Sequence, residues 1–191
     1  MNLIIKKIFV LVIVSMTLFA MSCTIDNGVT PTQAPQTTPT QTPTENKDTL
    51  PSFAAEQLDG TGYHSTEFAD HKLTMINVWA TWCNPCIGEL GHLGDIARNY
   101  ESKGVDVIGL LIDLENPNAI EEAEGLLASN NANYRNIKLS QTLNDLIITK
   151  YGISSVPTTL FVDSNSNVVK VIVGAKSYEK WAAIIDGLLE G

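Results

Sequence analysis

Apolar and polar positions divide the chain into a front part of unusual composition and a rear part in which apolar runs alternate with helix-like segments. Three stretches of the rear part are apolar runs of the kind that form buried strands, at residues 73–80, 105–113 and 157–174. A polar turn splits the last of them, which predicts a hairpin. Because strands that alternate with helices usually form a parallel sheet, and a hairpin adds antiparallel strands, we expect an α/β fold in three layers with a mixed central sheet.

The segments between these runs carry apolar residues at helical spacing. Four helices are expected, at residues 84–104, 117–131, 142–152 and 177–191. Pro117 opens the second of them, and Ser177 is a residue type that caps helix N-termini. Gly104 and Gly152 stand where the first and third helices should end, because glycine readily adopts the left-handed conformation that follows a helix. These elements make one domain over residues 50–191, which is long enough for a proper core.

The front of the chain has a different pattern. Residues 1–22 run from Lys6 and Lys7 through an apolar stretch to Ser22, which is the order of a secretory signal peptide. The apolar stretch is short for a membrane-spanning helix, which needs about 20 residues. Cys23 resembles the lipidated cysteine of bacterial lipoproteins, although the two residues before Ser22 depart from that pattern. We expect a lipoprotein-type signal with a lipidated Cys23, and the alternatives are a plain cleaved signal and an uncleaved anchor.

Residues 23–49 form a Thr-, Pro- and Gln-rich segment with almost no large apolar side chain. Such a composition cannot bury enough surface to offset the entropy of ordering, so we expect a disordered tether before the folded domain. The whole chain has 12 basic and 21 acidic residues, a formal charge of −9, and loss of Lys6 and Lys7 with the signal makes it more negative. This charge argues against nucleic acid or an anionic membrane surface as a partner.

The chemistry of the chain is concentrated in the stretch WATWCNPC at residues 79–86, which holds two of the three cysteines. Cys83 stands at the end of the first buried run and at the start of the first helix. Unpaired amides and the helix dipole favour negative charge there, so the pKa of the Cys83 thiol should fall below its free value of about 8.5. Cys83 would attack a disulfide, and Cys86, one turn into the helix, would resolve the mixed disulfide.

Two other uses of this cysteine pair are less favoured by the sequence. A structural staple between residues three apart closes so short a loop that it removes little entropy from the unfolded chain. A metal site needs two further ligands. Cys23 belongs to the leader, and no metal-binding spacing relates the histidines, which are His64, His71 and His92. We therefore expect a redox pair and no metal.

Two motifs together resemble the thioredoxin superfamily, and in particular its membrane-anchored extracytoplasmic branch, the TlpA/ResA-like proteins. They are NVWATWCNPC at residues 77–86 and GISSVPTTLFVD at residues 152–163. Features that open and close the family's domain are matched as well, at Pro51, Phe53, Asp59, Gly60, Gly174 and Ser177. The resemblance covers residues 50–191 and implies the thioredoxin-like α/β/α sandwich.

The resemblance also implies roles for residues around the cysteine pair. Pro157 corresponds to the family's cis-proline, which lies against the cysteines at the substrate groove. Val156 would offer its backbone groups to an extended substrate segment, in the manner of an added strand. Trp82 resembles the aromatic residue that flanks the reactive thiol, whereas Trp79 is expected in the core.

The chain departs from the family pattern near the cysteine pair. Asn77 replaces the buried Asp that assists proton transfer in many thioredoxins, and it cannot titrate. In the anchored branch a Glu one turn beyond the second cysteine is thought to matter, and Glu89 occupies that place on the helix face of Cys86. Burial there would raise the pKa of Glu89, and the alternative is a solvated helix residue. Gly91 replaces a common proline, and with two further glycines nearby the helix is expected to be weak.

We therefore expect a membrane-tethered, extracytoplasmic thiol:disulfide oxidoreductase that reduces protein disulfides and acts as a monomer. Cys83 and Cys86 would carry the electrons without a further cofactor, and a membrane thiol-electron transporter would supply them. The alternatives are a dedicated electron-transfer partner between such a transporter and a methionine sulfoxide reductase, and a thiol peroxidase. The peroxidase pattern, a Thr three residues before a lone reactive Cys preceded by Pro, is absent at Cys83.

Overall fold

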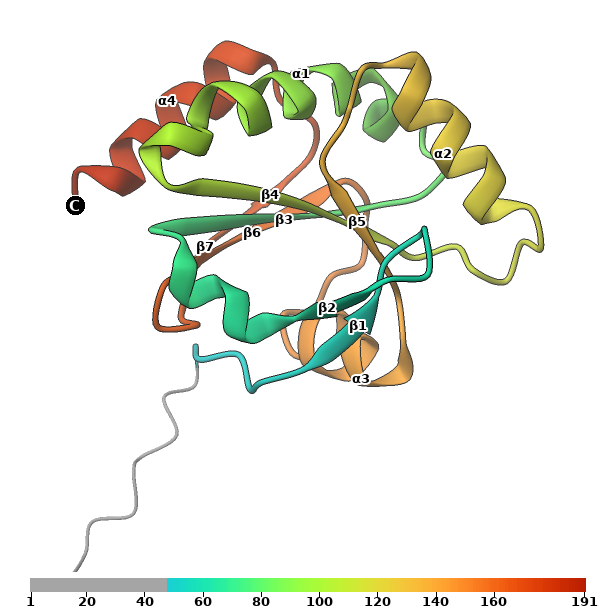
Figure 1. Ribbon diagram of the computed structural model, residues 1–191, viewed down its shortest axis with the longest axis horizontal. Helices are drawn as coiled ribbons and strands as arrows, with labels where there is room; N and C mark the ends of the chain where they lie inside the picture. The colour runs from blue at the N-terminus through green and yellow to red at the C-terminus, as the bar shows by residue number, and fades with distance from the viewer. Residues whose placement is uncertain (1–47) are drawn as a thin grey trace, which may run out of the picture. The chain divides into compact units, whose positions relative to one another are not determined.

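The computed structural model describes residues 48–191 (Figure 1). The expected signal peptide at residues 1–22, the expected lipidation of Cys23 and most of the expected tether lie outside the described residues. The domain expected over residues 50–191 lies entirely inside them.

A five-stranded sheet forms the middle layer, with the strand order β5-β4-β3-β6-β7. Its strands are β3 (Leu73–Trp79), β4 (Val105–Leu111), β5 (Arg135–Lys138), β6 (Thr158–Asp163) and β7 (Val168–Val173). β3, β4 and β5 are parallel, whereas β6 pairs antiparallel with both β3 and β7. Every residue of the central strand β3 is buried, because both faces of the sheet are covered there. The expected α/β class with a mixed sheet is confirmed.

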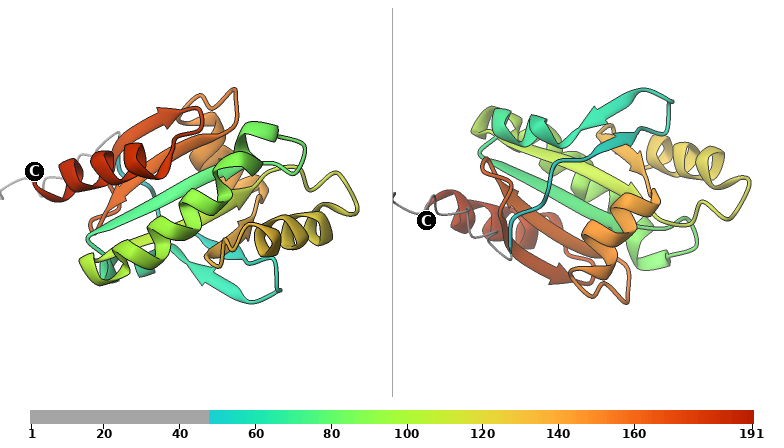
Figure 2. Two further views of the ribbon diagram at one scale, coloured as in Figure 1. Left: turned by 90° about the horizontal axis from the view of Figure 1, so that it is seen from above. Right: turned by 90° about the horizontal axis from the view of Figure 1, so that it is seen from below.

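Three helices cover one face of the sheet (Figure 1). They are α1 (Asn84–Tyr100), α2 (Ala119–Ser129) and α4 (Tyr178–Leu189). Seen from above, α1 and α4 lie side by side over the sheet (Figure 2). Leu93 and Ile96 of α1 and Trp181 of α4 are fully buried in one apolar cluster with the strands, as the helical spacing of these apolar residues requires.

Shorter elements cover the opposite face (Figure 2). They are the hairpin of β1 (Ala54–Glu56) and β2 (Gly62–His64), a 3-10 helix (Ser65–Asp70), α3 (Gln141–Leu143) and a π-helical segment (Asn144–Thr149). Phe53, Tyr63 and Phe68 from the hairpin region pack with Ile147 of the π-helical segment against the sheet. The third layer of the sandwich is therefore built from a hairpin and short helical turns.

Some elements differ from the sequence-based expectations. β1, β2 and β5 were not predicted, because strands of three or four residues show too little of an alternating pattern. The helix expected over residues 142–152 instead runs from Gln141 to Thr149 and changes from α- to π-helical geometry. Pro117 precedes α2 rather than opening it, and Ser177 is the N-cap residue of α4, although its side chain accepts no capping hydrogen bond.

The helix α1 is continuous over its whole length in spite of its glycines. A side chain at Gly94 would bring a Cβ within 2.6 Å of the backbone oxygen of Asn131 and 3.0 Å of the Cα of Ala132. Glycine at this position therefore lets the turn after α2 cross α1 at close range. Burial of the apolar face of α1 offsets the weak helix propensity of its glycines.

Candidate active site

The two cysteines of the motif lie between the end of β3 and the first turn of α1. Cys83 is the N-cap residue of α1, and its Sγ is joined to Cys86 Sγ in a disulfide of 2.05 Å. The backbone N–H of Cys86 donates to Cys83 Sγ over 3.2 Å. In the reduced protein, this N–H and the positive end of the helix dipole would stabilise a Cys83 thiolate. Cys83 keeps 4% of its surface exposed whereas Cys86 has none, so an incoming group reaches Cys83 first.

The loop before Cys83 is held by polar contacts from the neighbouring parallel strands. Thr81 donates to Asp113 Oδ2 twice, from its backbone nitrogen at 3.1 Å and from its hydroxyl at 2.6 Å. Trp79 is fully buried, as expected, and its Nε1 donates to Asn136 Oδ1 of β5 over 2.9 Å. The bond of Trp79 fixes the end of β3, and the bonds of Thr81 fix the loop that leads from β3 to Cys83.

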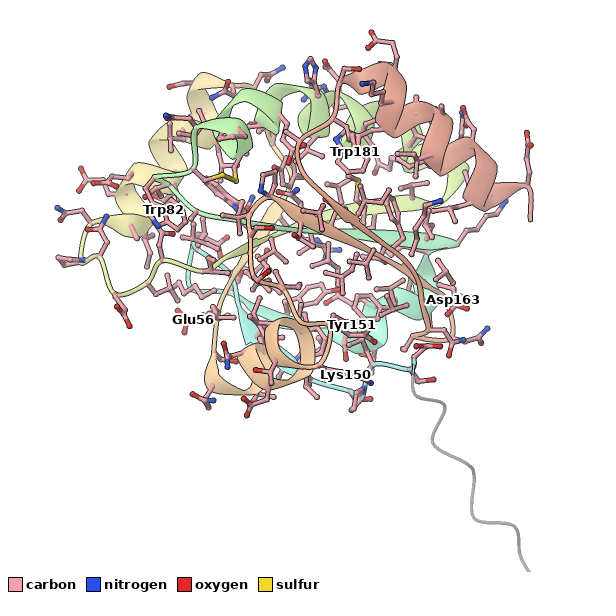
Figure 3. The ribbon with its side chains drawn as sticks, turned by 180° about the vertical axis from the view of Figure 1, so that it is seen from behind. Glu56, Trp82, Lys150, Tyr151, Asp163 and Trp181 are labelled. Carbon is pink, nitrogen blue, oxygen red and sulfur yellow. A yellow bond between two sulfur atoms is a disulfide. The ribbon has the colours of Figure 1, made fainter. Side chains whose placement is uncertain are left out.

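Trp82 and the loop of Pro157 lie at the same end of the molecule as the disulfide. The side chain of Trp82 is 67% exposed, and it projects into solvent beside the disulfide (Figure 3). The peptide bond between Val156 and Pro157 is cis, as the resemblance implies. Val156 packs against the apolar cluster that contains both cysteines and Trp79. An exposed aromatic ring and a partly buried valine thus flank the pair on its accessible side.

Glu89 is one turn beyond Cys86 on α1, and it is 1% exposed. Three groups surround its carboxyl. Asn77 Nδ2 of β3 donates to Oε1 over 3.0 Å, and the backbone N–H of Lys176 donates to Oε2 over 3.0 Å. Trp181 Nε1, near the same carboxyl, reaches no partner at hydrogen-bonding distance and angle within the described part of the chain.

The pKa of Glu89 is raised, because burial disfavours the charged carboxylate more than its hydrogen bonds favour it. The hydrogen bonds that the Lys176 N–H and the Asn77 amide donate to this carboxyl favour its charged form, so they lower the pKa of Glu89 and partly offset the effect of burial. Burial, with the charge of Glu89 as a second cause, also raises the pKa of Tyr134, which packs against the cysteine cluster. The structure therefore contradicts the alternative in which Glu89 is a solvated helix residue.

Sequence reasoning did not find three of the residues that build this site. Thr159 Oγ1 lies 3.0 Å from Asn77 Nδ2, and Lys176 supplies its backbone N–H from the turn before α4. Asn136 holds Trp79 from β5. Thr159, like Asn77, is a polar residue inside an apolar run, and this could have marked it as a candidate site residue. No local pattern shows that the two side chains meet.

Neither metal ligands nor a membrane-spanning helix can be identified between residues 48 and 191. No group of three or more His, Cys, Asp or Glu side chains in this range could hold a metal ion. Within the same residues, every helix is too short or too polar to cross a bilayer.

The family model for Redoxin matches residues 45–185 of the chain. Similar curated proteins include the thiol-disulfide oxidoreductase ResA of Geobacillus thermodenitrificans, which is 27% identical over 131 residues, 69% of this chain and 71% of the relative. The protein of the same name from Bacillus anthracis is 28% identical over 132 residues, 68% of this chain and 70% of the relative.

Solved structures show the same fold. A thioredoxin-family thiol:disulfide interchange protein from Chlorobium tepidum superposes with a TM-score of 0.65 at 23% identity, over 74% of this chain and 95% of that one. A thiol:disulfide interchange protein from a Bacteroides species gives a TM-score of 0.62 at 16% identity, over 75% and 90%. The Redoxin match spans most of the chain and the curated relatives agree with it, so the chain belongs to the Redoxin family and is a ResA/TlpA-like thiol-disulfide oxidoreductase of the thioredoxin superfamily.

Proposed function

We propose that this protein reduces disulfides of other proteins outside the cytoplasm, with Cys83 as the attacking and Cys86 as the resolving cysteine. The observation that carries the proposal is the position of the disulfide. Cys83 caps α1, accepts the N–H of Cys86, and is the more exposed of the two sulfurs. A thiolate formed there is stabilised and is reachable by a substrate.

The proposed reaction moves two electrons to the substrate in two exchange steps. The Cys83 thiolate attacks one sulfur of the substrate disulfide, forms a mixed disulfide and releases the other sulfur as a thiolate, which takes a proton. The thiol of Cys86 then loses its proton and attacks Cys83 Sγ. This closes the Cys83–Cys86 disulfide seen in the structure and releases the second substrate thiol.

Glu89 is the proposed proton acceptor for the second step. It is buried on α1 one turn after Cys86, and its raised pKa brings its protonation closer to neutral pH. Asn77 occupies the adjacent strand and cannot take a proton, so the carboxyl on α1 is the titratable group of this pair. The proton passes from the Cys86 thiol to Glu89 as the thiolate forms.

Trp82 and the Val156–Pro157 loop form the proposed substrate contact. Trp82 exposes most of its ring beside the disulfide, and Val156 is partly buried against the cysteine cluster. An extended substrate segment that pairs with the backbone of Val156 would bring its disulfide to Cys83.

The proposed place of action rests on the front of the sequence. Lys6, Lys7, the apolar stretch and the Ser22–Cys23 step support export and lipidation at Cys23, with residues 23–49 as the tether. Because each turnover leaves the pair oxidised, a reductant must restore it, and a membrane thiol-electron transporter is the proposed source.

The test is a redox titration of the protein, combined with an assay of insulin disulfide reduction by dithiothreitol. We expect a reduction potential in the reducing part of the range known for this fold, closer to about −270 mV than to about −120 mV, and a clear acceleration of insulin reduction. If Cys83→Ser no longer accelerates insulin reduction, the activity belongs to the Cys83–Cys86 pair. A potential near the oxidising limit would contradict the proposed direction. A reducing potential with no acceleration of insulin reduction would favour a dedicated electron-transfer partner.

A further inference from the structure

The turn between β7 and α4, residues 174–177, contacts two parts of the active site. At its start, the N–H of Gly174 donates to the carbonyl of Pro157 over 2.8 Å. Two residues later, the N–H of Lys176 donates to Glu89 Oε2 over 3.0 Å. One short segment therefore binds the loop of Pro157 and the buried carboxyl at the same time, so its shape affects where both of them lie.

The side chain of Lys176 folds back onto this turn. Its Nζ donates to the carbonyl of Val173 over 3.0 Å and to that of Gly174 over 2.6 Å, and the carbonyl of Ala175 lies 3.5 Å away. An ammonium group has three N–H donors, so it can bind carbonyls that converge from three successive residues. Bonds of this kind are stronger than bonds between neutral groups. The ammonium group thus ties the end of β7 to the segment that leads into α4.

The contacts of α4 leave the turn dependent on Lys176. Ser177 is the N-cap residue of α4, but its side chain accepts no capping hydrogen bond. Lys176 Nζ lies 5.8 Å from the centre of the Trp181 ring, which is fully buried beneath the first turns of α4 (Figure 3). A cation at this distance from an aromatic ring is attracted to it. Lys176 therefore joins the turn to the helix through its side chain.

Glu89 receives one of its two hydrogen bonds from this turn, and Asn77 donates the other. Burial raises the pKa of Glu89, and the bond from the Lys176 N–H opposes this rise most strongly. The titratable groups near the carboxyl are Cys86, Tyr134 and Lys176 itself. In the oxidised protein Cys86 is held in the disulfide, and burial raises the pKa of Tyr134, so that Tyr134 stays neutral. The turn is therefore the part of the surroundings that brings a positive charge to Glu89.

We propose that Lys176 is a positioning residue for disulfide exchange, whose ammonium group holds the β7–α4 turn in the shape that places the N–H of Lys176 on Glu89 and the N–H of Gly174 on Pro157. The inference rests on the proposed function, because it takes Glu89 to be the proton acceptor of the resolving step. Lys176 acts on the cysteine pair through these two backbone contacts.

The test compares Lys176→Met, which keeps a long apolar side chain without the ammonium group, with Lys180→Met, which removes the same charge from an exposed position of α4. In the oxidised full-length chain, carboxyl NMR follows the titration of Glu89, and the loss of one signal in Glu89→Gln assigns it. Lys176→Met should raise the pKa of Glu89 by about one unit, a tenfold change in the protonation equilibrium, because the carboxylate loses a donor. Lys180→Met should leave the titration unchanged. Lys176→Arg should also keep it, because a guanidinium group can bind the same carbonyls.

Two further measurements separate positioning from a general effect of charge. Amide hydrogen exchange at positions 174 and 176 should be about tenfold faster in Lys176→Met, because the turn opens more often without its charge-assisted bonds. The acid limb of the pH profile of insulin reduction should move to higher pH by about one unit, because the resolving step needs an ionised Glu89. Lys180→Met should match the wild type in both measurements.

The possible outcomes separate this proposal from the proposed function. An unchanged titration of Glu89 in Lys176→Met would overturn the positioning role and leave the exchange chemistry intact. A raised pKa of Glu89 with unchanged amide exchange would also overturn it, because Lys176 would then act through its charge alone. If the wild type does not accelerate insulin reduction, the proposed function fails, and the NMR and amide-exchange measurements still decide whether Lys176 holds the carboxyl. Circular dichroism of each variant confirms that it is folded.

Discussion

The side-chain amide of Asn77 on β3 donates a hydrogen bond to Glu89 on α1 over 3.0 Å, within the core of the protein. An Asp at this strand position would place a second carboxyl against Glu89, and the two charges would repel each other. With Asn77, the strand supplies a donor instead, and a single buried carboxyl remains. The proton chemistry proposed for the thiol pair is thereby moved from the strand to the helix that carries Cys86.

Replacement of Glu89 by Gln should lower the apparent pKa values of the reduced thiol pair. Loss of the nearby negative charge makes the thiolates easier to form, and each pKa unit corresponds to about 1.4 kcal/mol. Because a more stable thiolate favours the reduced form, the reduction potential at neutral pH should rise. The absorbance of the thiolates against pH measures the first effect, and a redox titration measures the second.

A matched comparison for this experiment is Asn77→Asp, which adds a carboxyl beside Glu89 and should shift the thiol pKa values upward. Superimposed titration curves for the wild type and Glu89→Gln would show that Glu89 does not interact with the thiols. The proton acceptor would then have to be another group.

Burial of Glu89 should also make the stability of the oxidised protein fall as the pH rises through the acid range. The native pKa is raised above the unfolded value of about 4.3, so the native state binds more protons between these two values. The free energy of unfolding therefore decreases with pH in this window, by at most about 1.4 kcal/mol per pH unit for one group. Urea unfolding at a series of pH values should show this fall in the wild type and a flatter profile in Glu89→Gln.

The division of labour between the cysteines predicts opposite behaviour of the two serine variants. Cys86→Ser retains the attacking sulfur and loses the resolving one, so it should accumulate mixed disulfides with protein substrates. Cys83→Ser should accumulate none, because Cys86 is completely buried. Mass spectrometry of the trapped species gives the result, and equal trapping by both variants would reverse or abolish the assignment.

Gly109 on β4 leaves room for the bond that holds Trp79. A Cβ at this position would lie 1.7 Å from Asn136 Oδ1, the acceptor of the Trp79 indole N–H. Gly109→Ala should therefore lower the free energy of unfolding by about 2–4 kcal/mol, through steric strain and loss of a buried hydrogen bond. Gly125→Ala is the control. It adds a Cβ with no neighbour within 4 Å in the middle of α2, and should stabilise the protein by about 0.5–1 kcal/mol.

Lipidation at Cys23 is open to a direct test. Metabolic labelling with a fatty-acid analogue should mark the wild-type protein. Cys23→Ala should remove the label and leave the chain either unprocessed or released from the membrane. Labelling that persists in the variant would exclude Cys23 as the attachment site.

Local pattern was enough to predict several features of the molecule. Long apolar runs located β3, β4 and the β6–β7 hairpin, and helical spacing with a glycine stop located α1. The position of Cys83 at a strand-to-helix junction was also expected from its place in the motif, whereas the cis bond before Pro157 was expected only from the family resemblance. These features depend on residues that are close together in the chain, so their signals survive without knowledge of the fold.

Contacts across the sheet were decided by tertiary structure alone. Asn77 meets Thr159 across 82 positions of sequence, and Lys176 reaches Glu89 across 87. The exposure of Val171 and Val173 on β7 likewise follows from the strand order, because the same valines in a central strand would be buried. The sequence by itself determined the class of fold and the reactive pair, since periodicity and capping act over a few residues. Which carboxyl is buried, what holds it and which strands lie at the edges of the sheet were determined only when distant segments packed together.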